Sequence, residues 1–283
     1  MGLTKTITRR VLPRPARNWL RSPRQSLRWA WSELQAKGGW LKTVELRDGW
    51  RFRSHPAALP FAYHAQIDDP AQRKEFDGFV ARCTPGMRLF DLGAHFGLFS
   101  LAALHFGGAE SEAVAVDPSP LAIRMIAFQA RANDVTDRLR TRLAAAGATR
   151  GTMALVAAGI ESAGYYVPPT GDHPAAEQSK VPTVSADSLA EEFGPPTHLK
   201  IDVEGAEGEV LDGAALTLRG VNPPFVFLEL HNDILKSRGA NPLHVLERLL
   251  QANYRLLDGN DRPIVPAMAV GPPVVRLVGE PNC

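Results

Sequence analysis

The sequence of 283 residues is long enough for one large domain, and 45% hydrophobic residues suffice for a sizeable core. The net charge of +2 hides an uneven distribution: residues 1–32 carry eight basic and no acidic side chains, which leaves 2 − 8 = −6 for residues 33–283. This acidic body argues against a globally basic nucleic-acid enzyme. No apolar run reaches the roughly 18–20 residues of a membrane-spanning helix.

Two cysteines, Cys83 and Cys283, lie far from any Cys/His spacing that would bind zinc, and they form no disulfide framework. A reducing, cytoplasmic location is therefore expected. The basic N-terminal extension, residues 1–42, mixes arginines with tryptophans, a pattern typical of an amphipathic element on an anionic membrane surface. Peripheral membrane contact through residues 1–32, an organellar transit peptide and a solvated tail remain open alternatives.

Residues 43–85 are expected to form a hairpin around Asp48-Gly49 and then a polar helix over residues 70–83. From residue 86 to 283, short apolar strands alternate with helices, which indicates an α/β domain. We expect about seven strands in a mostly parallel sheet with helices on both faces. The predicted strands cover 87–93, 113–117, 138–145, 198–202, 225–230, 254–258 and 274–278. The predicted helices cover 97–106, 119–133, 185–193, 206–219 and 241–252. Residues 151–184 break the pattern and predict a small antiparallel excursion.

Ligands of open α/β sheets bind at the carboxyl ends of the strands. Asp91 closes the first of these strands, and Gly93 and Gly97 follow it in the pattern Asp-x-Gly-x-x-x-Gly rather than Gly-x-Gly-x-x-Gly. Asp117 closes the second strand, twenty residues after Gly97, where an acidic side chain can bind ribose hydroxyls. This combination favours S-adenosylmethionine, a nucleoside with a cationic methionine end, and leaves a nicotinamide dinucleotide as the alternative.

Two later strands also end in charged residues. Lys200, Asp202 and Glu204 alternate with apolar residues, so we expect them to share one face. A carboxylate there can orient an acceptor hydroxyl, accept its proton or hold a divalent cation, although the sequence does not specifically indicate a metal site. An ion pair that only fixes the turn is the structural alternative. Glu229 and His231 end the next strand, and His231 is the best candidate for a general base among the histidines.

The segments "LFDLGAHFGLFS", "VAVDPSP", "LKIDVEGAEGEVLDGA" and "FVFLELH" resemble the FkbM-type S-adenosylmethionine-dependent methyltransferases over residues 86–258. The resemblance implies a Rossmann-like methyltransferase fold for residues 86–283 and O-methylation of sugars, glycans or secondary metabolites. It places Asp91, Gly93, Gly97 and Asp117 on the cofactor, with Asp202, Glu204 and His231 facing the acceptor. Together with the other strand-end residues, the predicted catalytic residues are Lys200, Asp202, Glu204, Glu229 and His231, and the predicted cofactor-binding residues are Asp91, Gly93, Ala94, His95, Gly97, Asp117 and Pro118. The family usually has asparagine where His95 stands, and Glu-Pro where this chain has Asp117-Pro118.

Asn222-Pro223-Pro224-Phe225 resembles the signature of amino-methyltransferases, which follows the fourth strand in those enzymes. Here that place holds "DVEGAE", and the tetrapeptide precedes the fifth strand. Amine methylation of nucleic acid is therefore not expected. The predicted function is methyl transfer to a hydroxyl of a small molecule or glycan. The alternative is a catalytically silent cofactor-binding or scaffold domain of the same fold.

Overall fold

The computed structural model describes residues 31, 34–35, 38, 40–47, 49–56, 58–59, 69–156, 165–166 and 178–282. The chain divides into two compact units, residues 1–63 and 64–283. In the first unit, β1 (Lys42–Glu45) and β2 (Arg51–Ser54) pair antiparallel, so the predicted hairpin is confirmed. Gly49 lies in its turn with a left-handed φ of 72°. Within residues 1–32, the structure describes only Trp31.

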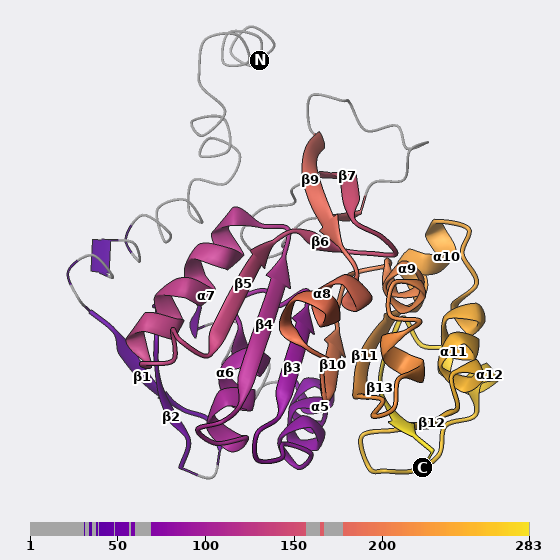
Figure 1. Cartoon of the computed structure of the whole chain (residues 1–283), viewed down its shortest axis with the longest axis horizontal. Helices are drawn as coiled ribbons and strands as arrows, with labels where there is room; N and C mark the ends of the chain where they lie inside the picture. The colour runs from indigo at the N-terminus through magenta and orange to yellow at the C-terminus, as the bar shows by residue number, and fades with distance from the viewer. Residues whose placement is uncertain are drawn as a thin grey trace, which may run out of the picture. The chain divides into compact units, whose positions relative to one another are not determined.

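A sheet of seven strands organises the second unit, with the order β12-β13-β11-β10-β3-β4-β5 (Figure 1). β10 pairs in parallel with both β3 and β11, whereas β13 runs antiparallel to its neighbours β11 and β12. The mostly parallel seven-stranded sheet is therefore as predicted. The order reverses between β3 and β10, which is the ligand-binding position of such sheets. The strands are β3 (Arg88–Leu92), β4 (Glu112–Asp117), β5 (Leu139–Leu143), β10 (His198–Ile201), β11 (Phe225–His231), β12 (Tyr254–Leu257) and β13 (Val274–Pro281).

Several helices of this unit begin just after a residue whose side chain accepts amides of the first turn. Asp69, Ser119 and Asn241 accept N-terminal N–H groups, each just before a proline that occupies a position without an amide donor. None of the helices in the described part of the chain is long and apolar enough to cross a membrane. They are α5 (Pro70–Val80), α6 (Leu98–Phe106), α7 (Pro120–Ala132), α8 (Ala186–Phe193), α9 (Glu207–Asp212), α10 (Asn232–Ser237), α11 (Pro242–Gln251) and α12 (Pro266–Ala269).

The predicted helix over residues 206–219 is too long. α9 ends at Asp212, and only a short 3-10 turn, Thr217–Arg219, follows it. Gly213 explains the break: a Cβ there would lie 2.3 Å from the carbonyl oxygen of Gly147, so the chain passes too close to neighbouring backbone to carry a side chain. The short helix α10, directly after β11, was not predicted.

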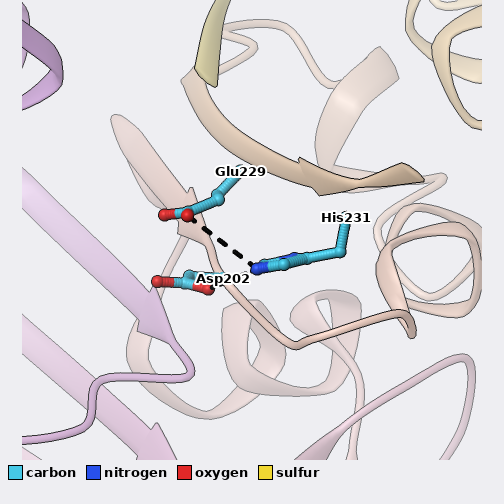
Figure 2. Close-up of side chains that lie close together, drawn as sticks. All are labelled: Asp202, Glu229 and His231. Atoms are coloured by element: carbon cyan, nitrogen blue, oxygen red, sulfur yellow. Dashed lines mark ion pairs between the residues drawn. The ribbon is translucent and has the colours of Figure 1, made fainter. Parts of the chain in front are cut away.

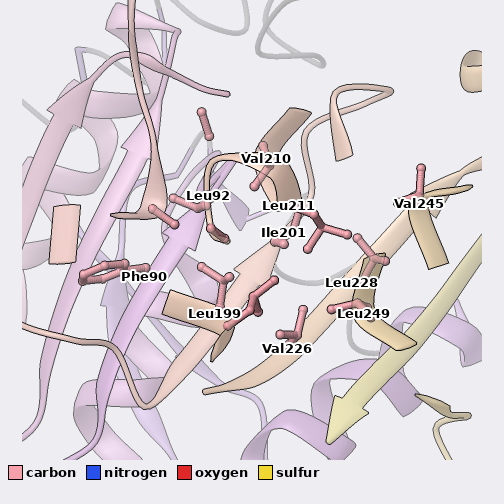
Figure 3. Close-up of a cluster of buried hydrophobic side chains, with 14 of the residues drawn as sticks. Phe90, Leu92, Leu199, Ile201, Val210, Leu211, Val226, Leu228, Val245 and Leu249 are labelled. Carbon is pink, nitrogen blue, oxygen red and sulfur yellow. The ribbon is translucent and has the colours of Figure 1, made fainter. Parts of the chain in front are cut away.

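The two faces of the sheet carry different side chains because residues alternate along each strand. Buried aliphatic residues of β3, β10 and β11 pack against α9 and α11; among them are Leu199 and Leu228 of the strands and Val245 of α11 (Figure 3). On the opposite face, Phe227 of β11 stacks edge to face with Phe79 of α5, their ring centroids 5.0 Å apart. Strand residues of the same parity as Phe227 therefore point toward α5.

A second, smaller sheet has the order β6-β9-β7-β8. Its strands are β6 (Ala145–Ala146), β7 (Gly151–Val156), β8 (Tyr165–Tyr166) and β9 (Gln178–Val184). β7 pairs antiparallel with β8 and β9, which confirms the predicted excursion, while β6 joins β9 in parallel. Residues 157–164 and 167–177 of this region lie outside the described residues.

Candidate active site

The turn after β3 joins three strand ends at the point where the strand order reverses. Gly93 has a left-handed φ of 84°, and a Cβ at this position would lie 1.8 Å from the carbonyl oxygen of Asp202. The amides of Gly93 and Ala94 both donate to the Val116 carbonyl of β4, at 2.9 and 3.0 Å. Gly97, at φ 76°, then begins α6. Glycine is thus required at position 93 so that the ends of β3 and β10 can touch.

Asp91 lies beneath this turn and is only 2% exposed. Its Oδ2 accepts hydrogen bonds from the Ser100 amide at 3.1 Å and from the Ser100 hydroxyl at 2.6 Å. Burial raises the pKa of Asp91 to about 6, although the Ser100 bonds act in the opposite direction. The carboxylate therefore fixes the first turn of α6 to the end of β3.

Asp117, at the end of β4, is fully buried. Its Oδ2 accepts from the amide of His95 and its Oδ1 from the amide of Ser119, both at 2.8 Å. Burial raises the pKa of Asp117 to about 7 against these two bonds. His95 has a left-handed φ of 47°, and its ring stacks on Phe96 with centroids 4.0 Å apart. Asp117 thus holds the turn in shape, and its contact with a ribose stays a prediction.

The predicted cofactor residues are brought together at the carboxyl ends of β3 and β4. Gly93, Ala94, His95 and Gly97 form one turn, and hydrogen bonds join that turn to β4. Pro118 follows directly after β4 and is half-buried. The sequence did not indicate that Ser100 bonds to Asp91. Asp91 and Ser100 are nine residues apart in the sequence, and they come into contact only because α6 folds back over β3.

Lys200 of β10 is the centre of a buried ion-pair network on the α5 side of the sheet. It is 1% exposed, and its Nζ lies 3.0 Å from Glu75 Oε1, 3.7 Å from Asp202 Oδ2 and 4.0 Å from Glu229 Oε2. Burial lowers the pKa of Lys200, but these carboxylates outweigh burial and hold it above its usual range. The predicted strand-end charges thus form a network.

Arg276 of β13 completes this network. It is the register partner of Glu229, pairs with that carboxylate, and also donates to Glu75 Oε2 at 3.1 Å. Burial and the nearby Asp202 raise the pKa of Glu229 to about 8. Sequence reasoning missed both Glu75 and Arg276. Glu75 is one of several charged residues in a polar helix, whereas Arg276 is the single charge in the apolar run "VVRLV", which was the one available signal.

His231 at the end of β11 is held by a carboxylate that the sequence analysis did not single out. Glu207 is fully buried, and its Oε1 lies 2.8 Å from His231 Nδ1 and also accepts the amide of Gly205 at 2.9 Å. Burial lowers the pKa of His231, but the bond to Glu207 and the neighbouring carboxylates raise it overall. We assign the proton to Nδ1, because Glu207 accepts there. Glu207 closes the distinctive run "KIDVEGAE", which was the available signal.

The opposite ring nitrogen of His231 faces two further carboxylates. Nε2 lies 3.8 Å from Asp202 Oδ1 and 3.8 Å from Glu229 Oε1, as Figure 2 shows. Glu204 lies outside the strand, because β10 ends at Ile201 and Glu204 has a left-handed φ of 48°. The alternation predicted through Glu204 is therefore wrong. Burial and Asp202 raise the pKa of Glu204, while His231 lowers it.

The tetrapeptide that begins at Asn222 lies at the other end of the sheet. Its last residue, Phe225, starts β11 and pairs in register with His198 at the start of β10. The carbonyl of Pro224 accepts a hydrogen bond from the Tyr254 hydroxyl at 2.9 Å. His231 is at the opposite end of β11, so the predicted structural role of this tetrapeptide agrees with its place.

The family model described as "Methyltransferase FkbM domain" matches residues 91–256. The chain belongs to the FkbM family of S-adenosylmethionine-dependent methyltransferases. The matched segment begins at Asp91 and includes both halves of the site, whereas Glu75 and Arg276 lie outside it. No curated protein matches the sequence.

Several solved methyltransferase structures are similar to this FkbM-family chain. The FkbM methyltransferase of Methylobacillus flagellatus is 13% identical with a TM-score of 0.44, and the match covers 80% of this chain and 58% of that one. This chain thus spans little more than half of that protein. A putative rRNA methylase of Clostridium thermocellum is 9% identical, with a TM-score of 0.47 and coverages of 76% and 97%. Aeropyrum pernix fibrillarin, with bound S-adenosyl-L-methionine, is 11% identical, with a TM-score of 0.40 and coverages of 85% and 94%.

The residues of this FkbM methyltransferase fit the family's cofactor. The turn that begins at Gly93 lies at the carboxyl end of β3, where the strand order reverses and where ligands of such sheets bind. The neighbouring ends of β10 and β11 carry more carboxylates than cationic side chains, which complements a positively charged sulfonium. The fit therefore rests on both position and charge.

Proposed function

We propose that this methyltransferase modifies a hydroxyl oxygen of a sugar, glycan or secondary metabolite. The observation that carries the proposal is the group formed by Asp202, Glu229 and His231, which adjoins the turn at Gly93 through the Asp202 backbone. When bound, S-adenosylmethionine supplies an activated methyl group. The chain's own residues then have to place a hydroxyl in line with that methyl and remove its proton.

A hydroxyl acceptor suits this group better than an amine of a nucleobase. A hydroxyl donates one hydrogen bond, which either Asp202 or Glu229 can accept, and its proton must be released for methylation. The position just after β10 holds Asp202 and Glu204 instead of an Asn-Pro-Pro sequence. Residues 202–207 therefore offer no side-chain amide that could accept a hydrogen bond from an exocyclic amine and donate one to the ring of the base.

The group offers two ways to take the proton from the acceptor. His231 Nε2 or Asp202 can accept it directly, since Glu207 keeps the proton of His231 on the far nitrogen. Alternatively, a cation held by the same side chains can lower the pKa of the hydroxyl. Either way, the hydroxyl has to lie next to Asp202 and His231.

The proposal is tested first by calorimetric titration with S-adenosylmethionine, using the wild-type protein and Asp117→Ala. We expect binding by the wild type and loss of binding in the variant, because Asp117 holds the turn through His95 and Ser119. A panel of sugars with free hydroxyl or amino groups then receives methyl-labelled cofactor, and the products are mapped by mass spectrometry. Methyl ethers are expected. Label on nitrogen, or cofactor binding without transfer to any hydroxyl, would contradict the proposal.

A further inference from the structure

The carboxyl ends of β10 and β11 bring three potential metal ligands together. Asp202, Glu229 and His231 each offer one ligand atom, and these atoms lie within 4.8 Å of one another (Figure 2). The two distances of 3.8 Å from His231 Nε2 to the carboxylate oxygens are too long for hydrogen bonds. They suit two ligands of one ion, because metal–ligand bonds of about 2.1 Å allow up to about 4.2 Å between ligand atoms.

Nδ1 of His231 is hydrogen-bonded in the way that the non-coordinating nitrogen of a metal-ligating histidine usually is. Such an imidazole usually donates its remaining N–H to a carboxylate, which fixes the ring and leaves the other nitrogen's lone pair for the metal. Glu207 supplies this carboxylate at 2.8 Å and is fully buried. The lone pair of Nε2 therefore points to the same place as Asp202 Oδ1 and Glu229 Oε1.

Basic side chains hold both carboxylate ligands in place. Asp202 directs Oδ1 toward His231, while its other oxygen, Oδ2, faces Lys200 at 3.7 Å. Arg276 pairs with Glu229 Oε1, the oxygen that faces His231, and in turn donates to Glu75 at 3.1 Å. The other oxygen of Glu229, Oε2, lies 4.0 Å from Lys200. These cations keep the two carboxylates beside His231.

The side chains around the three ligand residues carry more negative than positive formal charge. Two basic side chains meet five carboxylates, so the sum is 2 − 5 = −3 with His231 neutral: Lys200 and Arg276 against Glu75, Asp202, Glu204, Glu207 and Glu229. Among the described residues, Glu204 Oε2 and Glu207 Oε2 are buried without a hydrogen-bond partner. Uncompensated buried charge is costly, and a divalent cation would neutralise most of it.

We propose that Asp202, Glu229 and His231 bind one divalent first-row transition-metal ion. Two carboxylates and one imidazole suit Mn²⁺, Fe²⁺ or Zn²⁺ better than an oxygen-only ion such as Ca²⁺. The purpose of the site rests on the proposed function: the ion binds the acceptor hydroxyl oxygen and lowers its pKa, as a metal does for bound water. His231 then acts as a ligand instead of accepting the proton, and the proton of the hydroxyl passes to water.

The test is a titration of chelator-treated full-length protein with Mn²⁺, followed by the electron paramagnetic resonance signal of free Mn²⁺. We expect one Mn²⁺ per chain. Asp202→Asn and His231→Gln should each weaken binding at least about 10-fold, and Glu207→Gln about 10- to 100-fold through the orientation of the imidazole. Asp212→Asn is the matched control, since this exposed carboxylate on α9 pairs only with Arg248 among the described contacts, and it should bind as the wild type does. Thermal unfolding checks that every variant is folded.

The outcomes separate this inference from the proposed function. Absence of stoichiometric Mn²⁺ binding by the folded wild type, or equal binding by the Asp202 and His231 variants, overturns the metal site. Titration with S-adenosylmethionine in the presence of chelator tests the methyltransferase function independently of the metal. Cofactor binding without Mn²⁺ binding would remove the metal site and leave the proposed function in place. Mn²⁺ binding that depends on Asp202 and His231 supports the site even if no hydroxyl acceptor is methylated.

Discussion

Replacement of Asp91 by asparagine should stabilise the protein at alkaline pH. Burial raises the pKa of this carboxyl from 3.8 to about 6. For an acid with a raised pKa, the folded state holds the proton more tightly than the unfolded state. Stability therefore falls as pH rises from 3.8 to 6, and above pH 6 the full cost of the buried charge applies. Asparagine carries no charge and has none of this cost.

The shift of about two pH units corresponds to about 3 kcal/mol at pH 8, at 1.36 kcal/mol per unit. The same relation gives about half of this at pH 5. The amide oxygen of an asparagine at this position can still accept the two bonds from Ser100, so Asp91→Asn should gain stability by about these amounts. Ser100→Ala is the contrasting variant: it removes one donor from the carboxylate and should destabilise the protein by about 2 kcal/mol at pH 8.

The assay is urea unfolding of the wild type and both variants at pH 5 and pH 8, followed by circular dichroism. The decisive quantity is the difference in free energy of unfolding between Asp91→Asn and the wild type, which should be larger at pH 8. If Asp91→Asn is less stable than the wild type by the same amount at pH 5 and pH 8, the wild-type carboxylate is ionised at both pH values. The bonds from Ser100 and the nearby Lys200 would then outweigh burial, and the reasoning would be refuted.

Three further substitutions test the packing, two at the site and one at the opposite end of the sheet. Gly93→Ala should cost at least about 2 kcal/mol and abolish cofactor binding in calorimetry, because its Cβ meets the Asp202 carbonyl at 1.8 Å; an unchanged affinity would contradict this. Lys200→Met should lower the free energy of unfolding by about 3–5 kcal/mol, since it removes the buried cation between Glu75, Asp202 and Glu229 and leaves Arg276 to pair with two of them; a variant as stable as the wild type would contradict this. Tyr254→Phe should cost about 1–2 kcal/mol by removing the donor to Pro224, while cofactor affinity should not change.

The fold and the location of the site could be predicted from the sequence because both depend on local patterns. Strand and helix periods gave the seven strands, and the ends of parallel strands necessarily meet at one edge. Contacts between distant elements could not be predicted. Glu75 reaches Lys200 only because α5 packs over the face of β10 that bears Lys200. Arg276 reaches Glu229 only through the antiparallel register of β13. Neither position carries a local pattern that distinguishes it from a solvated charge.

The end of α9 and the role of Glu207 show a second limit. Helix propensity continues past Asp212, but tertiary contact between Gly213 and the Gly147 carbonyl ends the helix there. Glu207 is the first residue of α9 and looks like a favourable acidic residue at a helix start. Its hydrogen bond to His231 depends on where β11 ends, which the spacing along the chain does not give.

Lys200 was expected among the catalytic residues, and its surroundings define what it can do there. Its pKa is held above the usual range by Glu75, Asp202 and Glu229, so it stays protonated wherever the protein is folded and cannot accept a proton from a hydroxyl. A permanent cation behind Asp202 instead helps to direct that carboxylate toward His231. In the proposed reaction, Lys200 is therefore expected to act as a positioning residue. The proton of the acceptor would then pass to Asp202 or to His231 or, where these residues bind a cation, to water.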